Sequence, residues 1–248
     1  MRTPTPAQLL QVWERGSGPS AATCGLLLLG CSCDECSAEA LAALPLGRRD
    51  ALLLQLRVRL FGDEICSVAS CPQCAATVEA TFRCDDLLLT SPDNDTATLE
   101  HVSSTHGVHV QFRLPDSNDL LALEHGDGDG ADDARQLLLE RCVLAVSDAC
   151  AKRAVRSLSP PLQTEIAQAM AQADPQADLQ LSFRCPDCGH DWQPVFDIAR
   201  FLWQELHAWA LRMLRDVDTL AYAYHWAEDD ILSLSPRRRQ AYLELCAS

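Results

Sequence analysis

Two copies of a Cys-Pro-x-Cys motif carry the residues of this sequence that are best suited to chemistry. The first copy spans residues 71–74 and the second spans residues 185–188. Each copy is expected to be a turn that presents two thiolates, and two such turns supply the four sulfur ligands that tetrahedral zinc requires. The sequence therefore predicts a structural zinc site that is closed across a long insertion. Its four ligands are Cys71, Cys74, Cys185 and Cys188.

The likeness between the two copies extends beyond the cysteines. Val78 and Trp192 each lie seven residues after the first cysteine of their copy. Phe82 and Phe196 each lie eleven residues after it. One Cys-x-x-Cys pair is weak evidence for a metal site, but two pairs with matching flanks are strong evidence. Each copy is expected to form a turn, a return strand with an inward apolar residue, and a closing aromatic residue.

Other uses of these cysteines stay open at the level of the sequence. A redox-active pair is typical of a strand-to-helix junction, whereas the residues after Cys74 and Cys188 have the pattern of a strand. Disulfides would need an oxidising compartment. His190 could replace one cysteine or lie beside the metal, although a lone histidine in a turn is more often simply exposed. Four protein ligands leave no open position, so such a zinc ion would be structural and not catalytic.

The charge of the chain argues against nucleic acid as its partner. The 248 residues carry a net charge of -15, and only Arg237, Arg238 and Arg239 form a basic cluster. Zinc ribbons that bind nucleic acid need a basic face, which the composition does not provide.

The chain is expected to be a cytosolic protein with no membrane segment. Residues 1–16 are polar, include Pro4 and Pro6, and lack the apolar core of a signal peptide. The apolar run from Leu26 to Leu29 is far too short to span a membrane. In a reducing compartment, the thirteen cysteines would be free thiols or metal ligands.

A second group of cysteines invites a second metal site. It consists of Cys24, Cys31, Cys33 and Cys36, for which no matching half is evident. Small buried cysteines are common in helical layers rich in alanine and leucine, and this is the simpler interpretation. Each Cys-Pro-x-Cys turn is called a knuckle. Cys66 and Cys84 flank the first knuckle, but the second copy has no cysteine at the same offsets.

The periodicity predicts an α+β fold that is mainly α-helical, with two zinc-knuckle β-hairpins, a small β insertion, and a long C-terminal helix that ends in a helical head. Helices are expected over residues 8–15, 37–44, 47–61, 117–124, 132–146, 160–173, 198–224, 227–232 and 236–246. Strands outside the knuckles are expected over residues 98–103 and 108–114.

Five segments follow from this pattern. They are an N-terminal helical region (1–62), a first knuckle (63–90), an insertion with a β-hairpin and helices (91–176), a second knuckle (177–197), and a long helix with a helical head (198–248).

No catalytic motif stands out. The glycine-rich stretch 126–130 is not followed by the Lys-Ser/Thr of a phosphate-binding loop. There is no serine elbow, and the histidines do not pair at metalloprotease spacing. The pattern favours a binding or assembly protein with no small-molecule substrate.

The C-terminus resembles a known family. Residues 216–232, leading into residues 234–243, combine a helix, an aromatic-Trp pair, an acidic turn, Ile-Leu, and an Arg-rich helix with an aromatic residue. This combination is similar to the ending of baseplate hub assembly proteins of T-even-like contractile phages and phage-like contractile injection systems. Residues 47–50, the twin knuckles and residues 112–115 also resemble the larger members. Phage members often lack the knuckles, so the zinc is not a property of the wider family.

The resemblance implies a non-enzymatic role in building the baseplate or hub of a contractile tail, as a chaperone that leaves or as a component that stays. The implied partners are baseplate, hub or tube proteins. The C-terminal head would supply the contacts, and three arginines would give it a basic patch suited to an acidic partner. Alternatively, they are a solvated helix start, where positive charge opposes the helix dipole. The candidate partner-binding residues are Trp226, Ile231, Leu232, Arg237, Arg238, Arg239 and Tyr242.

Two rival functions stay open. The knuckles alone would suit a zinc-ribbon adaptor in transcription or RNA metabolism, which should bind nucleic acid with an affinity that depends on salt. A hydrolase or redox enzyme that uses the cysteines would need thiols that react while the metal is bound.

Overall fold

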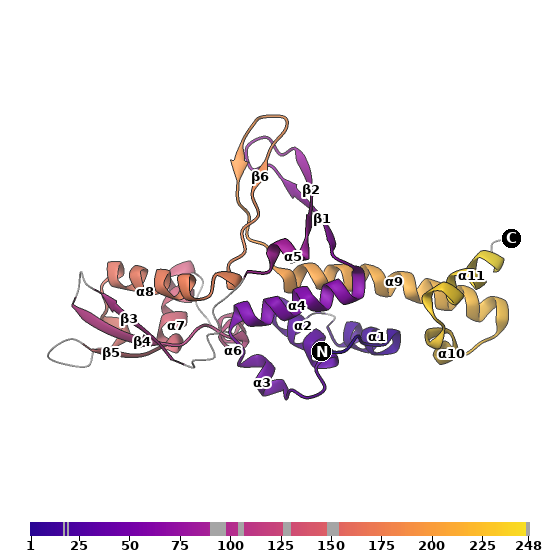
Figure 1. Cartoon of the computed structure of the whole chain (residues 1–248), viewed down its shortest axis with the longest axis horizontal. Coiled ribbons are helices and arrows are strands. Elements are labelled where there is room, and N and C mark those ends of the chain that lie inside the picture. Colours follow the sequence, from indigo (N-terminus) through magenta and orange to yellow (C-terminus); the bar gives the residue numbers. More distant parts are fainter. Residues whose placement is uncertain are drawn as a thin grey trace. The chain divides into compact units, whose positions relative to one another are not determined.

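The computed structural model describes residues 1–16, 18, 20–89, 98–103, 107–125, 130–147 and 154–246. The chain divides into two compact units. The first consists of residues 1–37 together with 199–248, and the second consists of residues 38–198. The described residues are mainly helical and form sheets of two, three and two strands, which confirms the predicted α+β class (Figure 1). None of the described helices combines the length and the apolar character needed to cross a membrane.

The first unit is helical. Its helices are α1 (Pro6–Arg15), α2 (Ala21–Ser32), α9 (Ile198–Tyr224), α10 (Glu228–Ser233) and α11 (Pro236–Cys246), of which α9 begins one residue before the unit does.

The long helix predicted over residues 198–224 is one continuous helix, α9. Ala210 and Met213 of α9 form a buried cluster with Leu10 of α1 and Leu232 of α10. Burying such side chains contributes roughly 1.5–3 kcal/mol each, so this cluster holds the three helices together. The helix ends because His225 adopts a left-handed backbone conformation with φ of 55°.

The last helix begins as its sequence predicts. Pro236 occupies the first helical position, where its missing N–H costs nothing. The backbone N–H of Arg238 donates to the Ser235 hydroxyl at 3.3 Å, which caps the helix.

The second unit mixes helices with all three sheets. Its helices are α3 (Ala38–Ala42), α4 (Leu46–Phe61), α5 (Cys84–Leu87), α6 (Ser117–Glu124), α7 (Ala131–Cys142) and α8 (Pro160–Ala173), with 3-10 turns η1 (Val155–Ser157) and η2 (Pro175–Ala177). Its strands are β1 (Glu64–Ser70), β2 (Thr77–Arg83), β3 (Leu99–Ser103), β4 (Val108–Phe112), β5 (Val143–Ser147), β6 (Phe183–Arg184) and β7 (Asp191–Trp192).

The three-stranded antiparallel sheet has the order β3-β4-β5. Alternate residues of β4, namely Val108, Val110 and Phe112, are buried. They pack with Leu139 of α7 and Ile166 of α8 to form the core of this part of the unit. The strand alternation therefore places one face of the sheet against the two helices.

The helix predicted over residues 132–146 is wrong in its last turn. The helix ends at Cys142, and the chain continues as strand β5. Val143 pairs with Phe112 and Val146 pairs with Val110, so both valines enter the sheet core. Helical periodicity continues through these residues, but β-branched side chains fit a pleated sheet well, and β4 offers a free edge for pairing.

Two hairpins project side by side from the second unit (Figure 1). In the first, β1 and β2 form seven cross-strand pairs, from Glu64 with Arg83 to Ser70 with Thr77. In the second, β6 and β7 form only two, with an isolated bridge between Gln180 and Val195 further down.

The segment 47–50 has a structural role at the start of α4. The backbone N–H of Gly47 donates to the Asp174 carboxylate at 2.9 Å, across 127 residues of chain. A Cβ atom at residue 47 would lie 1.8 Å from that carboxylate, so only glycine fits. Arg49 and Asp50 form a buried ion pair at 2.7 Å, and burial raises the pKa of Asp50 to about 6.

The segment 112–115 is also structural. Arg113 donates to the Asp119 carboxylate at 2.6 and 2.8 Å, and Arg141 donates to it at 2.7 Å. Burial raises the pKa of Asp119, but these hydrogen bonds outweigh it and hold the pKa below its ordinary value. Two arginines that converge on one buried carboxylate lock β4 to α6 and α7.

Candidate functional site

The four predicted cysteine ligands meet at the tips of the two hairpins. The sulfur atoms of Cys71, Cys74, Cys185 and Cys188 all lie within 4.8 Å of one another. Cys71 Sγ lies 3.7 Å from Cys188 Sγ, and Cys74 Sγ lies 3.5 Å from Cys185 Sγ. A tetrahedral zinc ion with Zn–S bonds of about 2.3 Å would hold its sulfurs about 3.8 Å apart. The cluster therefore has the dimensions of one four-sulfur site shared by both hairpins.

The two turns that present the cysteines have the same backbone structure. In the first, the N–H of Cys71 donates to the carbonyl of Ala76 at 2.8 Å, and the N–H of Ala75 donates to the carbonyl of Cys71 at 2.9 Å. In the second, the N–H of Cys185 donates to the carbonyl of His190 at 2.9 Å, and the N–H of Gly189 donates to the carbonyl of Cys185 at 3.0 Å. Each knuckle thus closes on itself with two matching hydrogen bonds.

The backbone of the first knuckle also favours the thiolate form of Cys71. Burial raises the pKa of the Cys71 thiol, but hydrogen bonds from the backbone N–H groups of Cys74 and Gln73 outweigh it and lower the pKa to about 7. The backbone N–H of Ala76 lowers the pKa of Cys74, but the sulfurs of the other three cluster cysteines, that of Cys185 first, raise it to about 12. Four sulfurs this close cannot all ionise unless a cation neutralises them.

The donor set limits the chemistry of the site. Four sulfur atoms in this arrangement suit zinc or iron and are poor ligands for magnesium or calcium. Four protein ligands leave no position for water or substrate, so a bound ion would join the hairpins and would not activate a reactant.

A T-shaped aromatic pair also joins the two hairpins. The rings of Phe82 and Phe196, which occupy matching positions of the two copies, lie 5.7 Å apart at 88°. Such a contact is worth roughly 0.5–1.5 kcal/mol beyond the area it buries. The hairpins are thus held by two kinds of contact, one between sulfurs and one between rings.

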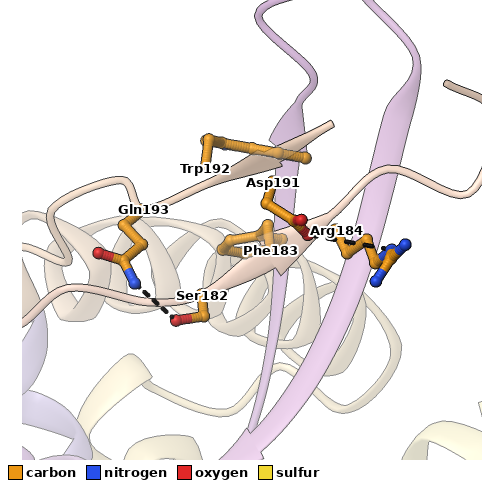
Figure 2. A pocket seen from close by; sticks show the side chains of 6 residues that line it. All are labelled: Ser182, Phe183, Arg184, Asp191, Trp192 and Gln193. Atoms are coloured by element: carbon orange, nitrogen blue, oxygen red, sulfur yellow. Dashed lines mark hydrogen bonds and ion pairs between the residues drawn. The ribbon is translucent and has the colours of Figure 1, made fainter. Parts of the chain in front are cut away.

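The second hairpin carries a shallow groove (Figure 2). Phe183 and Trp192, which face each other across the strands, stack at 5.3 Å and 22°. Arg184 and Asp191 lie 4.0 Å apart, and the Gln193 amide donates to the Ser182 hydroxyl at 3.2 Å. These six residues line the groove.

His190 and the other cysteines in the described part of the chain do not join the cluster. The His190 ring stacks on Trp192 with centroids 6.2 Å apart. Across the described ranges of the chain, the four knuckle cysteines form the single group of His, Cys, Asp and Glu side chains close enough to share a metal. The second cluster considered for Cys24, Cys31, Cys33 and Cys36 is therefore not formed.

Several candidate partner-binding residues at the C-terminus lie inside the first unit. Ile231 is fully buried, and Leu232 is nearly so. Arg239 is also buried, with its guanidinium 3.2 Å from the Asp216 carboxylate of α9. The expected patch of three arginines is corrected to two, because Arg239 fixes α11 to α9 and does not face solvent.

The other candidates lie at the surface of the head. Arg237 and Arg238 are exposed. The half-buried rings of Trp226 and Tyr242 pack at 4.8 Å, and both contact Tyr224, at 4.7 and 5.5 Å. The left-handed turn after Tyr224 folds Trp226 back over the helix end. The sequence predicts a break between the helices over 198–224 and 227–232, but it does not signal a left-handed turn, because a histidine occupies the position where glycine would have done so.

Fold and site together define a mainly helical α+β protein whose two hairpins converge on one candidate metal centre. A family model described as the T4 bacteriophage base plate protein matches residues 30–203. The match covers well over half of the 248 residues, so the chain belongs to this family. No curated protein and no solved structure matches it.

The matched range contains residues 47–50, both knuckles and residues 112–115, but not the C-terminal residues 216–243. The family recognised from the sequence is therefore confirmed through the segments that shape the second unit. The C-terminal resemblance is independent of that match.

Proposed function

We propose that this protein is a component or an assembly factor of the baseplate or hub of a contractile phage tail or a phage-like injection system. The observation that carries the proposal is the match of the base plate family model to residues 30–203. In this proposal the protein is not an enzyme, and it acts by binding other baseplate, hub or tube proteins.

A structural zinc ion at Cys71, Cys74, Cys185 and Cys188 is part of the proposal. The support is the set of four sulfurs within 4.8 Å of one another and the turns that aim them. Zinc supplies no reaction step here and holds together two hairpins that lie more than a hundred residues apart in the chain. Structural zinc sites contribute on the order of 10 kcal/mol to folding, so the second unit would depend on the ion.

The metal part is tested by elemental analysis of the purified protein. We expect one zinc ion per chain, and none in a variant that carries Cys71→Ser and Cys185→Ser. The matched control is Cys66→Ser, which changes an exposed cysteine outside the cluster and should keep the ion. If the purified protein contains iron and absorbs visible light, the proposed ion is iron and not zinc. If it contains no metal, this part of the proposal is refuted.

The C-terminal head is the proposed partner surface. Arg237 and Arg238 are exposed on a protein with a net charge of -15, and the helix that carries them, α11, also carries Tyr242, whose ring packs on Trp226. A surface with two cations and an aromatic cluster suits an acidic partner. Arg237→Glu with Arg238→Glu should weaken incorporation into particles. The same change at the exposed Arg212 and Arg215 of α9 is the matched control.

The role itself is tested by gradient fractionation of the native producer, in which mass spectrometry follows this protein beside the tail-sheath and tube proteins. Co-migration with finished particles is expected for a permanent component. Presence only with free hub proteins or light intermediates is expected for a chaperone. Absence from both would refute the proposal and favour a zinc-ribbon adaptor in transcription or RNA metabolism.

A further inference from the structure

Two of the close sulfur–sulfur approaches at the hairpin tips run between the hairpins. Cys71 Sγ faces Cys188 Sγ at 3.7 Å, and Cys74 Sγ faces Cys185 Sγ at 3.5 Å. A disulfide needs its sulfurs about 2.05 Å apart, so each pair must close by about 1.5 Å. Movements of this size are within reach of side-chain rotation at the tip of a turn. Each hairpin contributes one sulfur to each pair.

Each of these pairs also joins an accessible cysteine to a buried one. Cys74 and Cys188 are exposed, whereas Cys71 and Cys185 are buried, with 2% and 1% of their surface accessible. An oxidant in solution can therefore reach one member of each pair, and the other lies behind it in position to react with the product. This is the arrangement of an attacked and a resolving cysteine.

We propose that these pairs are latent disulfides, Cys71–Cys188 and Cys74–Cys185, which a peroxide converts from metal ligands into a covalent clamp between the hairpins. The inference rests on the metal-binding part of the proposed function. A component of a tail that is assembled in a reducing cell and then released meets an oxidising environment. The clamp keeps the hairpins joined there without the ion.

The oxidation balances with a peroxide as the oxidant. The exposed thiolate of Cys74 attacks one peroxide oxygen, the O–O bond breaks, and a sulfenic acid and hydroxide form. The thiolate of Cys185 then attacks the Cys74 sulfur, the S–O bond breaks, and hydroxide leaves as the disulfide forms. Cys188 and Cys71 react in the same way. Two hydrogen peroxide molecules and four protons thus yield two disulfides, four water molecules and the released divalent ion.

The test uses the full chain with Cys66→Ser, which removes an exposed third cysteine from the first hairpin. Elemental analysis first establishes that the reduced protein holds the ion, which separates a failure of the proposed function from a failure of this inference. Hydrogen peroxide is then added, and the released zinc is followed with a metal-binding dye. Free thiols are alkylated, and the denatured protein is digested with trypsin without reduction.

The sequence makes the result easy to assign. Trypsin cleaves after Arg59, Arg83, Arg184 and Arg200, so each hairpin tip lies on its own peptide, residues 60–83 and 185–200. Disulfides between the hairpins link these peptides in one species. Disulfides within a Cys-x-x-Cys turn leave two separate peptides, each with an internal bond. We expect the linked species to appear together with zinc release, and fragmentation to assign Cys71–Cys188 and Cys74–Cys185.

A second measurement checks the clamp itself. The oxidised, zinc-free protein should unfold at a higher urea concentration than the reduced, zinc-free protein, and dithiothreitol should abolish the difference. Separate peptides with internal disulfides, sulfinic acids without disulfides, or zinc retained under peroxide would each overturn the inference.

Discussion

The two hairpins carry the same knuckle on ribbons of very different length. The first has seven cross-strand pairs between β1 and β2, whereas the second has two between β6 and β7. Both turns use the same pair of backbone hydrogen bonds to present their cysteines. An isolated two-stranded ribbon is at best marginally stable in water, and a ribbon with only two cross-strand pairs is less stable still. The first hairpin therefore brings its own structure to the site, and the second depends on what it contacts.

Removal of the metal should produce the largest difference in behaviour between the two hairpins. After chelation of the zinc, we expect the backbone amides of residues 183–192 to lose hydrogen-exchange protection by about a hundredfold or more, since a structural zinc ion contributes on the order of 10 kcal/mol. The amides of β1 and β2 should lose much less, because their ladder remains. Hydrogen exchange followed by mass spectrometry resolves the two regions.

The Cys66→Ser variant serves as a control for this experiment, because it leaves all four ligands in place. Equal loss of protection in both hairpins would show that the metal, and not the ladder, holds the first ribbon as well. The comparison between a self-supporting and a dependent hairpin would then fail.

The next largest effect should come from the matching positions Val78 and Trp192. Trp192→Ala removes a ring that stacks on both Phe183 and His190, and we expect it to lower the free energy of unfolding by about 2 kcal/mol. Val78→Ala removes a smaller, half-buried side chain from a longer ladder and should cost about 1 kcal/mol or less.

Urea unfolding of the zinc-loaded variants, followed by circular dichroism, measures both changes. Zinc content is determined in parallel, so that loss of the ion is not counted as loss of packing. A Val78→Ala cost equal to that of Trp192→Ala would contradict the idea that the short ribbon relies on its aromatic stack.

The Phe82 and Phe196 rings test whether the hairpins also support each other away from the metal. In a double-mutant cycle of Phe82→Ala and Phe196→Ala, we expect a coupling energy of about 1 kcal/mol, because the rings make an edge-to-face contact. A coupling near zero in the zinc-loaded protein would mean that the sulfur cluster is the main link between them.

The sequence predicts the shared features of the hairpins better than their differences. The spacing Cys-Pro-x-Cys, with matching residues seven and eleven positions on, predicts the four-sulfur cluster and a closing aromatic residue in each copy, but not the contact between Phe82 and Phe196. It did not reveal that one ribbon is short, because strand length depends on pairing partners and not on the local pattern. For the same reason the local pattern predicts a helix through β5, since the place of this strand beside β4 depends on tertiary contacts.

Burial at the C-terminus was equally hidden in the sequence. Arg239 looks identical to Arg237 and Arg238 in a run of three, and only the Asp216 carboxylate 23 residues earlier distinguishes it. A helical run shows which residues share a face, but not which charged residue finds a partner there.

The smallest expected effect concerns the backbone of the two turns. The residue four positions after the first cysteine is left-handed in both, with φ of 61° at Ala75 and 73° at Gly189. Left-handed backbone costs a residue with a Cβ atom roughly 1–2 kcal/mol, and glycine avoids this cost but loses roughly 0.5–1 kcal/mol more conformational entropy on folding. The first knuckle is therefore the more strained of the two.

Exchanging alanine and glycine at these two positions should change the stability of the protein in opposite directions. We expect Ala75→Gly to stabilise the zinc-loaded protein by about 0.5 kcal/mol and Gly189→Ala to destabilise it by a similar amount. A Cβ atom at residue 189 meets no atom within 4 Å, so the cost there is conformational and not steric. Ala76→Gly, at the next residue, gains no relief because Ala76 is not left-handed, and it should be neutral or destabilising. Urea midpoints of the three variants decide the matter, and a gain from Ala76→Gly equal to that from Ala75→Gly would show that chain flexibility, and not strain at the knuckle, limits the first hairpin.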